Sequence, residues 1–532
     1  MSIDLSLQRI TKLLANLEPY TRPTIHIAGT NGKGSVSALL TQILLSAGLS
    51  VGRFNSPHLI NINDSITLNN IPISTSTYTS TYSKVKSVDK ELDIGTSNFE
   101  LLTATALQVF EDHKVDVVVC EVGLGGRLDA TNAISDEVVL VSVITAIDLD
   151  HTAFLGSTVE AIAREKAGIV RKGKTVVLSS QSHEGVEGVV KEICEERGSK
   201  LVSAETAMER EWDEVVDGSR PPSFSINPFN PPPARPTELT IEGEKYDVLL
   251  PLHGEHQLVN LGAALTVIHE LKKLKDDLNA SHPDTHLKVI SSVQNLSSQD
   301  LRSAILNCTW AGRLSFHSYP PSIVSNTGAY SQPIILADGA HNEAAAIKLS
   351  SYISSLISSP SSSKTSTSAE PRNLSLTFII SLSHSPPKTP ESVLLPLLSP
   401  FCTTSESSLR ASLKKSGIYN KVSTRIALMG FSPPEGMPWV RNVPPSQAAE
   451  ILRKSFPTSS YDARSKANTS RNDEEEITEL WISPDEEPEN VPVELQRVLK
   501  WAAGKGGKND DSLVVVAGSL YLVADLYRIL NR

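Results

Sequence analysis

The residues best suited to phosphate chemistry lie in a glycine-rich stretch near the N-terminus. The sequence "GTNGKGS" (29–35) follows an apolar run at 24–28 and leads into an apolar helical pattern at 33–46. Backbone amides of such a turn can surround a phosphate, the start of the next helix adds partial positive charge, and a lysine can bridge the outer phosphates. These parts are supplied by Gly29, Gly32, Lys33, Gly34 and Ser35.

The spacing of this loop departs from the usual phosphate-binding pattern. The first glycine lies closer to Lys33 than that pattern requires, and Gly34 separates the lysine from Ser35. GTNGKG also fails to match the GxGxxG of dinucleotide-binding folds. A tight strand–helix turn with a solvated lysine is the alternative. Three glycines and a Lys/Ser pair after a buried strand favour phosphate binding.

Several expected strands end in small or polar residues. In open α/β sheets, ligands bind beyond the carboxyl ends of the strands. The residues concerned are Gly29 after 24–28, Asn55 and Ser56 after 49–54, Glu121 after 115–120, Asp148 and His151 after 138–146, Asp338 after 333–337, and Gly518 and Ser519 after 512–517. Separate loops therefore point to one or two shared sites.

Carboxylates at these strand ends could hold a metal ion. Glu121 follows a buried run, and a carboxylate there suits Mg²⁺, a hard cation that prefers oxygen ligands. The same preference favours Asp148 or Asp150 as a ligand over His151. From the residues alone, Glu121 as a loop cap and Ser56 as a turn serine stay open as alternatives.

Strand-like runs alternate with helical patterns, which predicts an α/β fold with a mostly parallel sheet. Expected strands are 24–28, 49–54, 115–120, 138–146, 174–179, 333–337, 374–381, 424–429 and 512–517, and expected helices are 33–46, 98–113, 157–167, 257–273, 342–356 and 519–530. A new strand–loop–helix series begins beyond 316–332, so we expect two domains, 1–318 and 319–532.

Three segments interrupt this alternation. They are rich in Pro, Ser and charge, and comprise 219–236, 354–372 and 458–476. Such composition is typical of loops or flexible insertions. We expect them to carry no chemistry.

Composition limits the class of function. The chain has 532 residues, 39% apolar content and a formal net charge of −11, which argues against a nucleic-acid partner. No run of about 18 to 20 apolar residues and no signal-peptide block is visible, so we expect a soluble cytoplasmic protein without a membrane partner. The four cysteines lie far apart without CxxC spacing, so neither a zinc site nor a disulfide framework is expected.

Further motifs run in order along the chain. They are "NSPHL" (55–59), "FELLTATAL" (99–107), "EVGLGGRLDATN" (121–132), "DLDHTAFLG" (148–156), "IAREKAGIV" (162–170), "HGEHQLVNLGAAL" (253–265), "WAGRL" (310–314), "LADGAHN" (336–342) and "AGSLYLVAD" (517–525). With GTNGKGS they resemble the Mur ligase superfamily of ATP-dependent amide ligases, and within it the folylpolyglutamate synthase and dihydrofolate synthase group. The resemblance implies a central ATPase domain with a mostly parallel sheet and a smaller, Rossmann-like α/β C-terminal domain.

This resemblance also implies roles for individual residues. ATP contacts fall on Gly29, Thr30, Asn31, Gly32, Lys33, Gly34, Ser35, Asn260, Arg313 and Asp338. Two Mg²⁺ sites fall on Ser35, Ser56, Glu121 and His151. Here the resemblance favours the histidine as a ligand over the neighbouring aspartates. The implied catalytic residues are Lys33, Lys166 and His341.

Lys166 would by itself be taken for a solvated helix residue beside Glu165. In the similar ligases the matching lysine is carbamylated by CO₂. That reaction requires a neutral amine, so burial or nearby positive charge must lower the pKa of the lysine.

The implied reaction begins with attack of a substrate carboxylate on the γ-phosphate of ATP. The amine of L-glutamate then displaces phosphate from the acyl phosphate. The GTNGKGS and GGRLDATN forms resemble bacterial bifunctional enzymes and fungal dihydrofolate synthases, so the expected acceptor is dihydropteroate. Arg127 and Asp129 are expected to face it, with a structural salt bridge or turn as the alternative.

Three other functions stay open. They are a folylpolyglutamate synthase acting on tetrahydrofolate, an enzyme that performs both reactions, and a nucleotide-binding protein that has lost catalysis. We expect a monomer that acts on small molecules. A mitochondrial pool beside the cytoplasmic one is left open.

Overall fold

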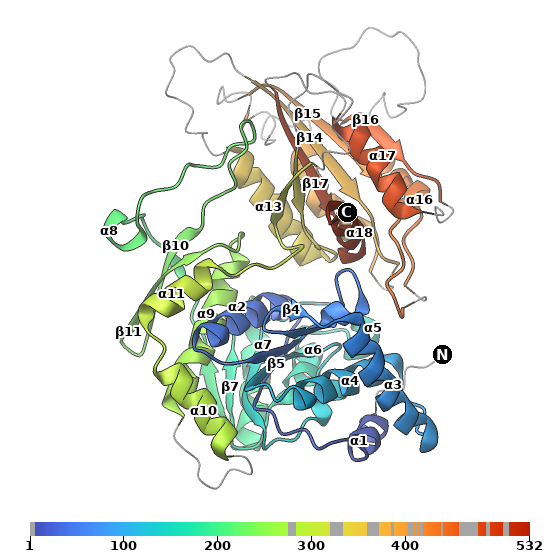
Figure 1. Ribbon diagram of the computed structural model, residues 1–532. Helices are drawn as coiled ribbons and strands as arrows, with labels where there is room; N and C mark the ends of the chain where they lie inside the picture. The colour runs from blue at the N-terminus through green and yellow to red at the C-terminus, as the bar shows by residue number, and fades with distance from the viewer. Residues whose placement is uncertain are drawn as a thin grey trace. The chain divides into compact units, whose positions relative to one another are not determined.

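The computed structural model describes residues 6–274, 283–319, 333–358, 372–384, 388–402, 409, 412–413, 419–437, 440–456, 477–485, 490–503 and 510–531. The chain forms two compact units, which Figure 1 shows in the colours of the sequence. The first unit comprises 1–218 and 234–310, and the second comprises 219–233 and 311–532. The chain therefore passes from one unit to the other three times.

The first unit is built on an eight-stranded sheet. Its strands are β1 (Thr24–Ala28), β2 (Val51–Phe54), β3 (Ile66–Leu68), β4 (Ile71–Pro72), β5 (Val117–Glu121), β6 (Val139–Ile144), β7 (Thr175–Leu178) and β8 (Lys200–Ser203), in the order β4-β3-β2-β5-β1-β6-β7-β8. Pairing is parallel from β2 to β8, and β3 and β4 are antiparallel. The carboxyl ends of β2, β5, β1 and β6 therefore meet at one edge of the sheet.

Helices accompany this sheet. They are α1 (Gln8–Leu14), α2 (Lys33–Ser46), α3 (Thr75–Glu91), α4 (Asn98–Asp112), α5 (Thr152–Leu155), α6 (Val159–Lys166), α7 (Glu184–Glu196), α8 (Glu214–Asp217), α9 (His256–Lys273), α10 (Pro283–Gln294) and α11 (Ser298–Leu306). The start of α4 shows how the sequence fixes an element. Ser97 accepts a hydrogen bond from the amide of Glu100, and the Glu100 side chain accepts one from the Ser97 amide.

Alternate side chains of each strand face opposite layers of helices. On β5, Val117 and Val119 pack in the core that contains residues of α2 and α9, while Val118 and Cys120 pack with residues of α4. This alternation follows from the two-residue period of a strand. Because β5 is buried on both faces, its sequence reads as a continuous apolar run.

A small antiparallel sheet belongs to the first unit as well. It consists of β9 (Met208–Glu209), β10 (Arg235–Ile241) and β11 (Glu244–Leu250), in the order β11-β10-β9. Leu239 and Val248 of this sheet join the same core as α2 and α9.

The second unit contains a six-stranded sheet. Its strands are β12 (Ser315–Ser318), β13 (Ile334–Ala337), β14 (Arg372–Ile380), β15 (Tyr419–Leu428), β16 (Ile477–Ile482) and β17 (Asp511–Ala517), in the order β12-β13-β17-β14-β15-β16. Pairing is parallel except between β12 and β13. The helices described here are α13 (Glu343–Ser358), α14 (Glu391–Cys402), α16 (Pro445–Ser455), α17 (Val491–Ala503) and α18 (Leu520–Leu530).

The structure confirms the α/β class and the mostly parallel sheets. Each expected strand and helix has a counterpart, with ends that differ by a few residues. The sequence analysis did not predict several elements. These include α3, α7, α10, α11, α14, α16, α17, β8, β12, β16, the β3–β4 hairpin and the β9–β11 sheet. Among the described residues, no helix is both long and apolar enough to cross a bilayer.

The proline-rich segment 219–233 contributes to the core of the second unit. Ile226 is 5% exposed there, and the rings of Phe224 and Phe229 lie 5.8 and 6.3 Å from that of Phe316. From the sequence, this segment was expected to be a loop. The sequence analysis did not identify its apolar side chains as core residues. We call residues 219–233 the crossing arm.

The remaining sequence expectations about organisation are only partly covered. Residues 354–358 of the second insertion belong to α13, whereas 359–371 and 458–476 lie outside the described residues. The compact units divide at Trp310. The domain boundary at 318 stays a prediction.

Candidate active site

The expected phosphate-binding loop joins β1 to α2, and two of its glycines are required by their surroundings. Gly32 has a φ of +98°, and a Cβ atom there would lie 2.3 Å from Oδ1 of Asn260. A Cβ atom on Gly29 would lie 1.9 Å from the hydroxyl oxygen of Thr145. Any larger residue would therefore push the loop away from the strand ends.

The side chain of Lys33 folds back over this loop. Its Nζ donates hydrogen bonds to the carbonyl oxygens of Gly29, at 3.0 Å, and Thr30, at 3.2 Å. The same atom lies 3.8 Å from a carboxylate oxygen of Glu121. The ammonium group is therefore held between the start of the loop and the end of β5.

The loop that follows β6 holds the phosphate-binding loop in place. The amides of Thr30 and Asn31 both donate to the carbonyl oxygen of Ala146. Asn31 also donates from Nδ2 to the carboxylate of Asp148 at 2.7 Å, and His183 lies 3.2 Å from the other Asp148 oxygen. Asp148, which oxygen chemistry favours as a metal ligand, thus supports the loop.

Asn260 lies beside the loop as expected and belongs to a buried amide chain. Its Nδ2 donates to Oε1 of Gln257, and the Nε2 of Gln257 donates to the hydroxyl of Ser35 at 3.1 Å. Gln257, which the sequence did not single out, is 1% exposed. The helix α9 therefore fixes the first turn of α2.

Glu121 ends β5 with its carboxylate directed by a neighbouring strand end. Nδ2 of Asn55 donates to this carboxylate at 2.6 Å. Because β2 and β5 are adjacent parallel strands, Asn55 and the half-buried Ser56 follow β2 close to Glu121. Carboxylate and hydroxyl oxygens are ligands that Mg²⁺ prefers, so Glu121 and Ser56 stay candidates for a metal site together with Ser35.

His151 is placed at the start of α5 in a left-handed backbone conformation, with φ of +51°. Its side chain is exposed, and its amide donates to the carboxylate of Asp150 at 2.7 Å. Asp150 itself is 5% exposed. An accessible imidazole and a buried carboxylate therefore follow β6 together.

Lys166, the last residue of α6, is buried with 4% exposure. Its Nζ donates to the carbonyl oxygen of Gly29 at 2.8 Å. Burial, with a further contribution from the charge of Lys33, lowers the pKa of Lys166 to about 7. A large fraction of this amine is therefore neutral near pH 7.

The "GGRLDATN" loop packs against the helix end that carries Lys166. A Cβ atom on Gly126 would lie 2.6 Å from the carbonyl oxygen of Lys166. Arg127 is more than half exposed and forms an ion pair of 2.9 Å with Glu165. The loop thus encloses the backbone of the lysine and leaves the Arg127 side chain at the surface.

Asp129 is bound by its own loop. Its carboxylate accepts hydrogen bonds from the amides of Leu124 and Thr131 and from the Thr131 hydroxyl, at 2.6 to 3.0 Å. Burial raises the pKa of Asp129, and these hydrogen bonds act in the opposite direction. Within the described residues, its contacts are those of a loop-shaping residue.

His26 of β1 was not singled out from the sequence. The Thr131 hydroxyl donates to Asp129, so its oxygen accepts from Nε2 of His26 at 2.8 Å. The other ring nitrogen lies 3.4 Å from Nη2 of Arg171, which also donates to Asn132. Burial and the charge of Arg171 lower the pKa of His26. The signal that could have identified His26 is its place as a polar residue in the apolar run "TIHIA".

The expected residues of the second unit form a separate group at the end of β13. The carboxylate of Asp338 accepts from the amides of Leu314 and Ala340, at 2.9 and 2.8 Å. The Arg313 guanidinium packs against the glycine that follows Asp338. His341 is exposed and donates from Nδ1 to a backbone carbonyl oxygen of the same turn at 2.8 Å.

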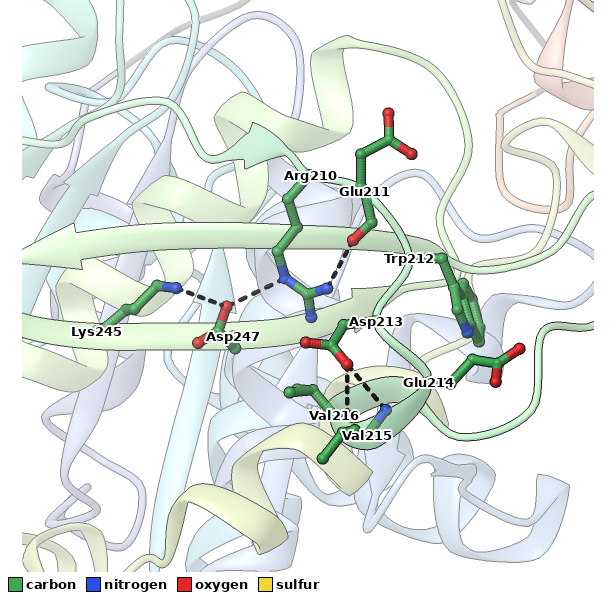
Figure 2. Close-up of a pocket in the computed structure, with 9 residues that line it drawn as sticks. All are labelled: Arg210, Glu211, Trp212, Asp213, Glu214, Val215, Val216, Lys245 and Asp247. Carbon is green, nitrogen blue, oxygen red and sulfur yellow. Dashed lines mark hydrogen bonds and ion pairs between the residues drawn. The ribbon is translucent and has the colours of Figure 1, made fainter.

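A pocket elsewhere in the first unit has a different character. Figure 2 shows that it lies over the β9–β11 sheet and α8, and none of the expected site residues lines it. Arg210 and Lys245 both pair with Asp247, while Asp213 accepts from two amides of α8. These side chains pair with one another, so we assign the pocket no part in the chemistry.

Comparisons with known proteins agree with this architecture. The profile of the Mur ligase middle domain matches residues 27–268, and that of the dihydrofolate synthetase C-terminal domain matches residues 420–529. The dihydrofolate synthetase of Saccharomyces cerevisiae is 30% identical over 534 residues, which cover 100% of this chain and 99% of the yeast protein. The dihydrofolate synthase/folylpolyglutamate synthase of Bacillus subtilis is 32% identical over 352 residues, 64% of this chain and 70% of that protein.

A solved structure shares the fold. The bifunctional folylpolyglutamate synthase/dihydrofolate synthase of Yersinia pestis, complexed with AMPPNP and a Mn ion, has a TM-score of 0.64 and 22% sequence identity. The likeness covers 100% of this chain and 95% of that chain. Together with the full-length yeast relative, these matches show that the chain belongs to the dihydrofolate synthetase and folylpolyglutamate synthase family, which carries the Mur ligase middle domain.

Proposed function

We propose that this protein is an ATP-dependent ligase that joins L-glutamate to the carboxylate of 7,8-dihydropteroate. The products are dihydrofolate, ADP and phosphate. The observation that carries the proposal is the meeting of Lys33, Glu121 and Lys166 at adjoining strand ends, in a chain that aligns over its full length with a dihydrofolate synthetase.

The first step brings together two anions, the acceptor carboxylate and the γ-phosphate. Two unit charges about 4 Å apart repel by roughly 4 kcal/mol at an effective dielectric of about 20. Lys33 would counter this repulsion by turning from the loop carbonyls to the phosphates. The amides at the start of α2 would hold the nucleotide, because those of Thr30 and Asn31 already donate to Ala146. We assign the rest of the 29–35 loop, Asn260, Arg313 and Asp338 to ATP as well.

Magnesium fits the oxygen-rich donor set at these strand ends. Ser35, Ser56, Glu121 and His151 would hold it in two sites, and Asn55 directs the Glu121 carboxylate. Bound Mg²⁺ supplies positive charge to the phosphates. The Mn ion complexed with the Yersinia pestis enzyme supports a divalent cation here.

Lys166 is proposed to react with CO₂. The ammonium group first gives one proton to solvent. The neutral amine then adds to the carbon of CO₂ and releases a second proton to solvent, so the cationic side chain becomes a carbamate anion. The lowered pKa of Lys166 and its burial near Gly29 support this assignment. His341 is proposed as a further catalytic residue.

The acceptor is proposed to contact the "GGRLDATN" loop. Arg127 is accessible and could bind a carboxylate after releasing Glu165. Asp129 would act through the loop that it holds. We further propose a monomer in the cytoplasm.

A bifunctional enzyme that also extends tetrahydrofolate with glutamate is the second candidate. The Bacillus subtilis relative, named for both activities, favours it. The two candidates share the same phosphoryl chemistry and differ in the acceptor.

Purified protein with ATP, Mg²⁺ and labelled glutamate tests both candidates. Product and ADP should form with dihydropteroate, and product with tetrahydrofolate as well would establish the bifunctional enzyme. Turnover of tetrahydrofolate without turnover of dihydropteroate would overturn the first proposal. ATP binding without ADP formation with either acceptor would point to a protein that has lost catalysis.

A further inference from the structure

Arg53 is a buried cation for which the described residues offer no anionic partner. It lies on β2 and is 8% exposed. Its Nε is fully buried without an acceptor, and no described residue forms a hydrogen bond or an ion pair with its side chain. Its guanidinium makes a cation–π contact with the Trp310 ring, whose centroid is 5.0 Å from Cζ. Burying an unpaired charge is costly, so a partner is expected.

In the second unit, Arg425 also lies over a tryptophan ring, and its guanidinium has hydrogen-bond acceptors. It is 2% exposed, and its guanidinium lies 3.8 Å from the centroid of the Trp501 ring. Its terminal nitrogens donate to the carbonyl oxygens of Trp501 and Ala502 and to the carboxylate of Glu479, at 2.9 to 3.1 Å. Among the described residues, the terminal nitrogens of the arginine over a tryptophan therefore have acceptors in the second unit and none in the first, while the Nε atom has no acceptor in either.

The position of Arg53 indicates where its partner would come from. Trp310 packs directly on the phosphate-binding loop, because a Cβ atom on Gly34 would lie 2.6 Å from the edge of its ring. On the neighbouring strand, Glu121 is the carboxylate whose charge acts on Arg53. Arg53 thus belongs to the same corner of the first unit as Lys33.

The nearest carboxylate on the neighbouring strand already has other partners. The carboxylate of Glu121 already faces Lys33 at 3.8 Å and accepts from Asn55 at 2.6 Å. Glu121 is therefore engaged by Lys33 and Asn55 and forms no ion pair with Arg53. An anionic ligand at the loop would give Arg53 a partner.

We propose that Arg53 is a second cationic residue of the phosphate-binding loop, whose partner is a phosphate group of the bound nucleotide. The inference deepens the proposed function and rests on it for the identity of the nucleotide. A planar guanidinium that is held over a ring keeps its fork of donors in one plane for an oxyanion. An acceptor carboxylate offers the same chemistry, so the test separates the two sources.

The test compares Arg53→Met with Arg425→Met, in the full chain. Without ligand, Arg53→Met should unfold at the same temperature as the wild type or higher, because it removes an unpaired buried charge. Arg425→Met should unfold at a clearly lower temperature, because it leaves several acceptors unpaired. Calorimetry should then show ADP and AMPPNP binding about tenfold to a hundredfold weaker to Arg53→Met, and unchanged for folded Arg425→Met. Arg53→Lys should recover part of the affinity.

Two results would overturn the inference. One is that Arg53→Met binds ADP and inorganic phosphate as tightly as the wild type does. If the KM of this variant for dihydropteroate also rose, Arg53 would be assigned to the acceptor instead of the nucleotide. The other is a loss of ligand-free stability as large as that of Arg425→Met. If the wild type bound no nucleotide, the proposed function would fail, and binding of inorganic phosphate to the wild type and to Arg53→Met would still decide the role of Arg53.

Discussion

The carbonyl oxygen of Gly29 accepts hydrogen bonds from both Lys33 and Lys166, at 3.0 and 2.8 Å. Two ammonium groups on one carbonyl oxygen repel each other, and both lie at the end of a buried strand. This arrangement explains why the pKa of Lys166 falls through burial first and the charge of Lys33 second. It also places the proposed carbamate next to the phosphate-binding loop.

Replacement of Lys166 by alanine should remove most ligase activity while nucleotide binding remains. The reason is that the proposed carbamate is lost, whereas the loop amides and Lys33 are unchanged. Turnover and ADP affinity are measured on the same preparation. Short carboxylates such as acetate, added to the variant, should restore part of the rate. Near-normal turnover of Lys166→Ala would contradict the carbamate role.

Stability should depend on pH through Lys166 in a defined direction. Its pKa is about 7 in the folded chain and has a reference value of 10.5. Between these values the unfolded chain binds a proton that the folded chain does not, so raising the pH stabilises the fold. Lys166→Met should therefore gain stability over the wild type at pH 6 and lose that advantage towards pH 10. Urea midpoints at both pH values measure this, and an advantage that grows with pH would refute it.

Gly32→Ala should abolish nucleotide binding. The substitution requires a left-handed backbone with φ of +98° and places a Cβ atom 2.3 Å from Asn260, so the loop must move. Gly48→Ala is a matched control, because Gly48 has φ of +79° with no atom within 4 Å of its added Cβ. Both variants should lose stability through backbone strain. Calorimetric titration with ADP should separate them, and equal affinities would contradict the proposed role of the loop.

The crossing arm should stabilise the second unit. Ile226→Ala removes a buried side chain from its core and should cost about 2 to 5 kcal/mol in the free energy of unfolding. Val215→Ala, at a side chain that is 95% exposed, should change this free energy little. Chemical denaturation of the full chain measures both. Equal stability of the two variants would show that the arm does not contribute to the core.

Strand ends carried part of the signal for the candidate site. The 29–35 loop and Glu121 were expected from strand ends and Lys166 from the family resemblance. The first unit places these residues near one another, and their roles stay predictions. Residue chemistry alone favoured Asp148 or Asp150 as a metal ligand. In the structure the Asp148 carboxylate binds Asn31 and lies beside His183, and the Asp150 carboxylate accepts from the amide of His151. No sequence pattern indicates which of several nearby carboxylates a loop will use.

Other residues could not be predicted because their partners are remote in the chain. Gln257 bonds Ser35, and His26 bonds Thr131, only because packing places α9 and the "GGRLDATN" loop against the central strands. Arg53 was passed over because its neighbour Trp310 is equally remote. His26 is moreover a polar side chain in an apolar stretch, which the hydrophobic pattern treats as an exception.

The sequence by itself determined the α/β class, the parallel strands, the glycine-rich turn at 29–35 and the family, because strand and helix periods and short motifs are local properties. The tertiary structure decided the pairing of buried charges and the course of the crossing arm. It brought Lys33 and Lys166 to one carbonyl oxygen and left Arg53 over Trp310. The physical reason is that burial and electrostatic partners depend on which distant segments pack together, and a one-dimensional pattern does not contain that information.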